Sequence, residues 1–217
     1  MSDESRCDVL LTASLEFEEA ISALPELHKR LEALTYRSSA SGPYVRDYAV
    51  AVLRRIAELG EDTKRSVDQG RIITACMTAR GILETAGLFV GFIGQLIEMR
   101  KKEDDKDRFR KTVKRHFFAS REFEDQLTAK SPHVADGVRA LDKHVEGSSK
   151  IYDILCEGVH PNWAGTTGLN LPEFDPGPVH IRSAMAALTT ARAVKTYCDV
   201  ATKAFSGELQ PGRMIGW

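Results

Sequence analysis

Cysteine is scarce in this chain, and its few cysteines form no recognisable cluster. They lie far apart, without a CxxC pair and without a histidine at the spacing of a zinc ligand set. A disulfide framework and a structural zinc site both need such clusters, so we expect reduced thiols in the core, no metal and no cofactor. The four residues are Cys7, Cys76, Cys156 and Cys198.

An excess of charge of one sign is also absent, because 30 Lys and Arg stand against 31 Asp and Glu. No global field therefore favours nucleic acid, membrane or an acidic partner, and any partner must be recognised by a local patch. The uncharged run at 85–97 falls short of the ~20 residues that a bilayer span needs. The N-terminus is acidic and lacks the order of a signal peptide, so we expect a cytoplasmic protein with no membrane contact.

Local signatures of common enzyme classes are missing as well. The chain has no internal repeat, no glycine-rich phosphate loop and no GxSxG nucleophile turn. No segment alternates with a period of two, so no strand is predicted. With 42% hydrophobic and 28% charged residues, the composition is that of an ordinary folded globular protein.

Helical periodicity is what the sequence has in abundance. The segment 72–99 is apolar around nearly its whole circumference, which predicts a central helix surrounded by others. Gly87, Gly91 and Gly94 leave one side of that helix bare, and we expect another backbone to approach closely there. Apolar residues at three-and-four spacing predict an amphipathic helix at 45–60. Further helices are expected at 108–118, from Ser131 and Pro132 to about 145, at 150–160 and at 181–205.

Together these segments predict an all-α, single-domain bundle of about six to seven helices around a central apolar helix at about 70–100. Residues 1–36 contain a break at Pro25 and can form a peripheral helical hairpin. Residues 162–178 have the composition of an irregular loop, of a length that usually carries function or disorder. One domain is expected over 1–217, because this length is near the upper end of what a single core serves.

Arg80 and Glu84 are out of place in the apolar central helix. Burying two charges costs several kcal/mol per ion unless they pair well, so we expect them to face a polar partner. A polar stripe on the predicted helix at 150–160, with Asp153, Glu157 and His160 at helical spacing, is the economical choice. The catalytic candidates are His160, Glu157, Arg80 and Glu84, and the substrate-binding candidates are Tyr152, Asn162 and Trp163.

The same residues also have a purely structural interpretation. Arg80 and Glu84 can belong to an ion-pair network, and His160 can cap its helix and bond Glu157 while Pro161 ends the element. Glu157 and His160 spell ExxH, a motif of di-iron bundles. That site needs two such motifs and two further glutamates, and this chain has only one ExxH, so no metal is predicted.

A run of basic residues at 108–118 contains phenylalanines, and this combination can bind single-stranded RNA. Acidic residues at 103–107 partly neutralise the run. The alternative is a solvated helix face with Phe109 and Phe117 anchored in the core. The candidate nucleic-acid contacts are Arg108, Arg110, Lys111, Lys114 and Arg115.

The Arg-x-x-x-Glu segment at 79–84 and the segment 152–162 resemble the HEPN-like group of bacterial defence and toxin bundles. The resemblance covers about half the chain. It implies a helical fold, a site often completed across a homodimer and, in active members, metal-independent RNA cleavage by an Arg followed by His after four to six residues. Two pairs have that spacing, Arg110 with His116 and Arg139 with His144, whereas His160 has no such arginine.

Three functions follow as hypotheses. The first is a helical-bundle protein that binds a partner or self-associates as a homodimer, in bacterial defence or regulation. The second is a HEPN-like ribonuclease, and the third is a small-molecule-binding bundle with a cavity lined by Arg80, Glu84, Tyr152 and Trp163. The sequence leaves open whether the protein is an enzyme, and it identifies neither the ligand nor the pathway.

Overall fold

A computed structural model describes residues 3–33, 42–101, 106–118, 132–161 and 177–205. Within these ranges there are nine α-helices and no strand, which confirms the predicted all-α class. The helices are α1 (Asp3–Ser22), α2 (Leu24–Glu32), α3 (Gly42–Asp68), α4 (Ile72–Lys101), α5 (Lys106–Phe118), α6 (Val134–Asp142), α7 (Ser148–Val159), α9 (Gly177–Thr189) and α10 (Ala191–Phe205).

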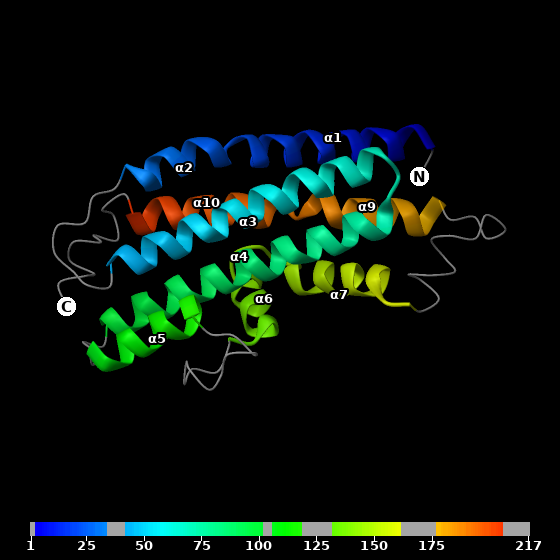
Figure 1. Cartoon of the computed structure of the whole chain (residues 1–217). Coiled ribbons are helices and arrows are strands. Elements are labelled where there is room, and N and C mark those ends of the chain that lie inside the picture. Colours follow the sequence, from blue (N-terminus) through cyan, green and yellow to red (C-terminus); the bar gives the residue numbers. More distant parts are fainter. Residues whose placement is uncertain (1–2, 34–41, 102–105, 119–131, 162–176, 206–217) are drawn as a thin grey trace.

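The central helix is α4, as predicted. It packs against α3, α5, α6, α7, α9 and α10, and Figure 1 shows it passing through the middle of the bundle. Its side chains are buried along most of its length, including Ile82, Phe89 and Ile93, because α4 is apolar on nearly every side and its neighbours cover those sides.

The apolar character of α4 raises the question of a membrane. Among the described helices it is the one that is long and apolar enough to cross a bilayer, over Ile72–Met99. Most of that window is buried inside the bundle, and the core helix of a soluble protein passes the same test. Length and composition are therefore weak evidence for a membrane span here.

Two pairs of helices lie end to end. Single residues, Ala23 and Thr190, separate α1 from α2 and α9 from α10, so the nine described helices make seven rods, in line with the predicted number. Figure 1 shows α2 continuing along the direction of α1, and the expected hairpin in residues 1–36 is therefore wrong. Pro25 sits at the start of α2, where its missing N–H is not needed, so it interrupts the rod without reversing it.

The rod of α1 and α2 is also not peripheral, because it contributes to the main core. Phe17, Leu24 and Leu31 are almost completely buried.

The expected helix end at Gly60 is wrong, since α3 continues to Asp68. A Cβ on Gly60 would meet the Ile21 side chain of α1, so this glycine leaves space for that side chain within a continuous helix.

The start of α6 also differs from the expectation of a cap at Ser131, a residue outside the described part of the chain. His133 is the capping residue, with an extended backbone and a side chain that accepts a hydrogen bond from the Ala135 N–H at 3.3 Å. Any side chain with a well-placed acceptor can satisfy a free N–H at a helix start, and here an imidazole does so.

Close backbone approaches fix α6 and α7 against α4. A Cβ on Gly87 would lie 2.6 Å from the Gly137 carbonyl of α6, which confirms the close contact expected on this side of α4. A Cβ on Gly158 of α7 would lie 2.9 Å from Cys76 Sγ. Small residues thus bring α7 against the part of α4 that carries Arg80 and Glu84.

Candidate functional site

Three polar side chains meet where α7 lies against α4, and we call them the α4–α7 cluster: Arg80, Glu84 and Tyr152. Arg80 Nε donates to Glu84 Oε1 at 2.8 Å, across one turn of α4. The Tyr152 hydroxyl donates to the same oxygen at 2.9 Å. The guanidinium carbon of Arg80 lies 5.4 Å from the centre of the Tyr152 ring, within the range of a cation–π interaction.

The cluster is partly open to solvent. The side chains of Arg80 and Glu84 are 33% and 24% exposed, so their charges retain much of their hydration. The ion pair therefore avoids the large desolvation cost expected for two charges in an apolar helix. Its position follows from the sequence, because residues four apart share one face of a helix and Tyr152 reaches that face from α7.

The electrostatic environment keeps Arg80 charged and keeps Tyr152 and Cys156 neutral at neutral pH. Burial raises the pKa of Tyr152 to about 12, and its hydrogen bond to Glu84 adds to the effect. Burial also raises the pKa of the neighbouring Cys156 thiol, although the charge of Arg80 opposes this. The hydrogen bond to Glu84 raises the pKa of Arg80. Neither a phenolate nor a thiolate is therefore available as a nucleophile at neutral pH.

The predicted stripe on α7 faces a different way. Asp153 and Glu157 are exposed and line a groove of about 320 Å³ between α7 and α9, together with Arg182. They do not form the expected contact with the ion pair on α4. Tyr152 already takes the side of α7 that faces α4, and the next residue along a helix is rotated by about 100°.

His160 stands at the end of α7 as its C-terminal cap. It is exposed, and its backbone N–H donates to the Cys156 carbonyl at 3.0 Å. Within the described ranges, no hydrogen bond or ion pair joins its imidazole to Arg80 or Glu84. The other two substrate-binding candidates, Asn162 and Trp163, lie outside the described residues.

A second polar site, which sequence reasoning missed as a unit, is a groove of about 490 Å³ between α4, α5 and α6. His116 and His144, the histidines of the two Arg/His pairs, both line it, together with Arg115 and Lys143. The spacing of each pair is visible in the sequence. Their convergence depends on how α5 and α6 pack on α4.

His116 is the best-defined member of this groove. Its Nδ1 lies 3.0 Å from the Thr112 carbonyl, and its ring centre lies 4.7 Å from that of Phe92. A carbonyl can only accept a hydrogen bond, so Nδ1 carries the proton in the neutral ring and Nε2 keeps a lone pair. Burial lowers the pKa of His116, which favours that neutral form at pH 7.

No protein-family model, curated protein or solved structure matches this chain. Any function must therefore be supported by the chemistry of the sites themselves. The HEPN-like resemblance stays a prediction.

The predicted RNA-binding helix is α5. Its described basic side chains, Arg108, Lys111 and Arg115, are exposed, whereas the side chains of Arg110 and Lys114 lie outside the described part of the chain. Phe109 is buried, as the alternative interpretation expected, whereas the side chain of Phe117 lies outside the described residues. The described residues contain no group of three or more His, Cys, Asp or Glu placed to hold a metal ion.

Proposed function

We propose that this protein acts by binding a protein partner at the α4–α7 cluster, and that the cluster is not a catalytic centre. The observation that carries the proposal is the double use of Glu84. One carboxylate oxygen accepts hydrogen bonds from both Arg80 and Tyr152. These two hydrogen bonds hold an arginine and a tyrosine in a fixed arrangement at the surface, which favours recognition of a partner.

The surroundings of the cluster support recognition. Met77 lies one turn before Arg80 on α4, and the residue is 55% exposed. Methionine, arginine and tyrosine are enriched at the centres of protein interfaces, where rigid side chains lose little entropy on binding. The Arg80 and Tyr152 side chains are already ordered by Glu84, so a partner would meet a preformed surface.

A second copy of this chain is the partner to test first. We expect sedimentation equilibrium to show self-association that weakens in Met77→Asp and in Tyr152→Ala. Leu11→Asp is the matched control, because Leu11 is an equally exposed apolar residue on α1, with 62% of its side chain accessible. Dissociation by Leu11→Asp alone would place the contact on α1. A strict monomer at the highest soluble concentration would count against self-association.

The second candidate function is metal-independent RNA cleavage in the groove between α4, α5 and α6. It is favoured by the presence of His116 and His144 in one groove with Arg115 and Lys143. The lone pair on Nε2 of His116 could accept the proton of a ribose 2′-hydroxyl, His144 could protonate the leaving oxygen, and the cations could stabilise the phosphorane.

This candidate predicts cleavage of a fluorogenic RNA in the presence of EDTA. We expect His116→Gln and His144→Gln each to reduce the rate at least about 100-fold, the usual contribution of general acid–base catalysis. His28→Gln on α2 is the control, since His28 lies on another element and contacts Glu32. Intact RNA at micromolar protein rejects the candidate. Activity lost only in His160→Ala would move the site to the end of α7.

A further inference from the structure

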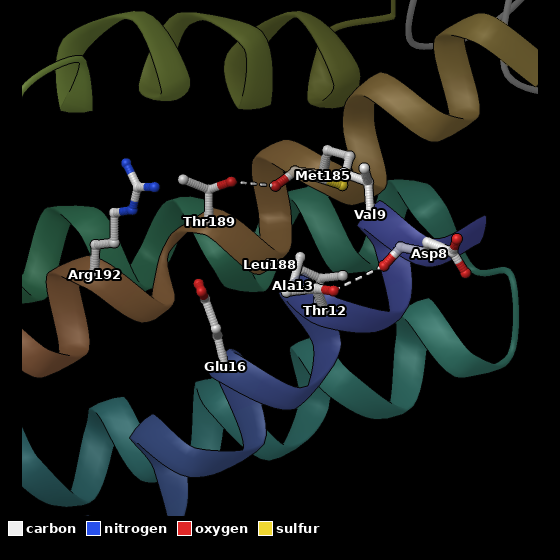
Figure 2. A pocket seen from close by; sticks show the side chains of 9 residues that line it. All are labelled: Asp8, Val9, Thr12, Ala13, Glu16, Met185, Leu188, Thr189 and Arg192. Carbon is white, nitrogen blue, oxygen red and sulfur yellow. Dashed lines mark hydrogen bonds between the residues drawn. The ribbon is translucent and has the colours of Figure 1, made fainter. Parts of the chain in front are cut away.

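A groove of about 310 Å³ runs between α1 and the junction of α9 with α10 (Figure 2). Apolar side chains line part of it, among them Val9, Ala13 and Leu188. Three charged residues also line it: Asp8 and Glu16 from α1, and Arg192 from the first turn of α10. This volume is at the lower end of the range for small-molecule sites, which is about 300–1,000 Å³.

Glu16 and Arg192 do not neutralise each other. Within the described ranges, neither Glu16 nor Arg192 forms an ion pair or a hydrogen bond. One turn further along both helices, the equivalent residues Glu19 and Lys195 do pair, with 3.2 Å between Oε2 and Nζ. An ion pair therefore joins α1 to α10 at Glu19 and Lys195, and no ion pair joins the described residues of these two helices at Glu16 and Arg192.

Hydroxyl groups add polar acceptors to the same space. Thr12 donates to the Asp8 carbonyl at 2.9 Å and Thr189 donates to the Met185 carbonyl at 2.6 Å, as the dashed lines in Figure 2 mark. Because each hydroxyl proton is already used within its own helix, each oxygen can only accept from a ligand. The groove thus offers acceptors and a carboxylate for a cation, and a guanidinium for an anion.

We propose that this groove binds a zwitterionic small molecule with an aliphatic side chain, of which an aliphatic α-amino acid is the simplest. Its ammonium group would contact Glu16 and the Thr189 hydroxyl oxygen, and its carboxylate would take the planar donors of Arg192. Its side chain would cover the apolar lining formed by Val9, Ala13 and Leu188. No covalent step is involved. The proposal is independent of the partner-binding function of the α4–α7 cluster.

The test uses the full chain, labelled with ¹⁵N, and titrates it with L-leucine while amide resonances are followed. We expect saturable shifts confined to residues near 8–16 and 185–192. Glu16→Gln and Arg192→Gln should each weaken binding about tenfold or more, the usual effect of losing a charge-assisted hydrogen bond. Lys203→Gln, an exposed cation further along α10, is the matched control and should leave binding unchanged.

Two analogues of leucine test the carboxylate contact and the ammonium contact separately. Leucinamide lacks the carboxylate, so its weaker binding should not weaken further in Arg192→Gln. 4-Methylpentanoate lacks the ammonium, so its binding should not weaken in Glu16→Gln. No response at about 10 mM L-leucine, where a Kd of ~1 mM would give near saturation, overturns the proposal. Shifts that persist in both charge variants overturn it as well, once circular dichroism shows that the variants are folded.

Discussion

Gly87 of α4 and Gly137 of α6 face each other with no room for a side chain between them. A Cβ on Gly87 would lie 2.6 Å from the Gly137 carbonyl carbon, and one on Gly137 would lie 2.8 Å from the Leu88 nitrogen. Gly94, two turns further along α4, has nothing within 4 Å of its Cβ position. The same residue type therefore has two different roles on a single helix.

This contrast predicts opposite effects of the same substitution. Gly87→Ala should lower the free energy of unfolding by about 1–3 kcal/mol, because the added methyl group meets backbone that cannot move aside. Gly94→Ala should raise it by about 0.5–1 kcal/mol, since alanine favours a helix more than glycine does. Urea unfolding followed by circular dichroism measures both. Equal effects of the two variants would show that α4 and α6 are not in backbone contact.

Hydroxyl deletion at two tyrosines should show the effect of burial. The Tyr197 hydroxyl donates to the Ala49 carbonyl at 2.7 Å in a fully buried position. Tyr197→Phe leaves that carbonyl without this donor and should cost about 1–3 kcal/mol, whereas Tyr152→Phe at the half-exposed α4–α7 cluster should cost about 1 kcal/mol or less. Chemical unfolding of both variants tests the order. A larger loss for Tyr152→Phe would contradict the partial exposure of the cluster.

Alkaline pH should destabilise the protein through the phenols of Tyr152 and Tyr48. Burial raises the pKa of both Tyr152 and Tyr48 from 10 to about 12, so the unfolded chain releases these protons first. Their stabilising contribution is complete below pH 10 and is lost as the pH rises through 12. Unfolding midpoints measured from pH 9 to 12 should fall less steeply in Tyr152→Phe and in Tyr48→Phe. If the unfolding midpoint falls with pH as steeply in both variants as in the unchanged protein, these two tyrosines do not cause the loss of stability.

Acid should act through His116, whose pKa is lowered from 6.5 chiefly by burial. The unfolded chain then takes up the proton at a higher pH than the folded protein does. The free energy of unfolding should therefore decrease as the pH falls from about 6.5 through the folded-state pKa. His116→Gln should remove part of this decrease, and a decrease of unchanged size in that variant would contradict the prediction. The difference between pH 7.5 and 5.5 in urea unfolding is the measurement.

Part of the candidate site could be predicted from the sequence. Arg80 and Glu84 stand out because two charges at helical spacing are unexpected in an apolar segment, and their pairing follows from that spacing. Tyr152 is predicted beside them, although its role as the partner of Glu84 depends on the face that α7 turns toward α4. The predicted contact of Asp153 and Glu157 with the ion pair is wrong for the same reason, because these two residues line the groove between α7 and α9.

Other features had no reliable signal in one sequence. A glycine after an amphipathic segment, such as Gly60, is typical of a helix end. Only the packing of α1 on α3 shows that Gly60 instead leaves space for the Ile21 side chain. The groove that joins His116 to His144, and the groove between Glu16 and Arg192, bring together residues from elements far apart in the chain. Nothing in the spacing of these residues indicates that they meet.

The amino-acid sequence alone determined the helical class and the central position of α4, because periodicity and apolarity act locally along each helix. Tertiary structure decided which polar side chains meet, and it did so through small residues. The approach of Gly87 to Gly137 and of Gly158 to Cys76 sets the position of α6 and α7 on α4. A rotation of a helix by one residue, about 100°, exchanges a contacting side chain for an exposed one, so the partners of Glu84 depend on packing that spans the whole bundle.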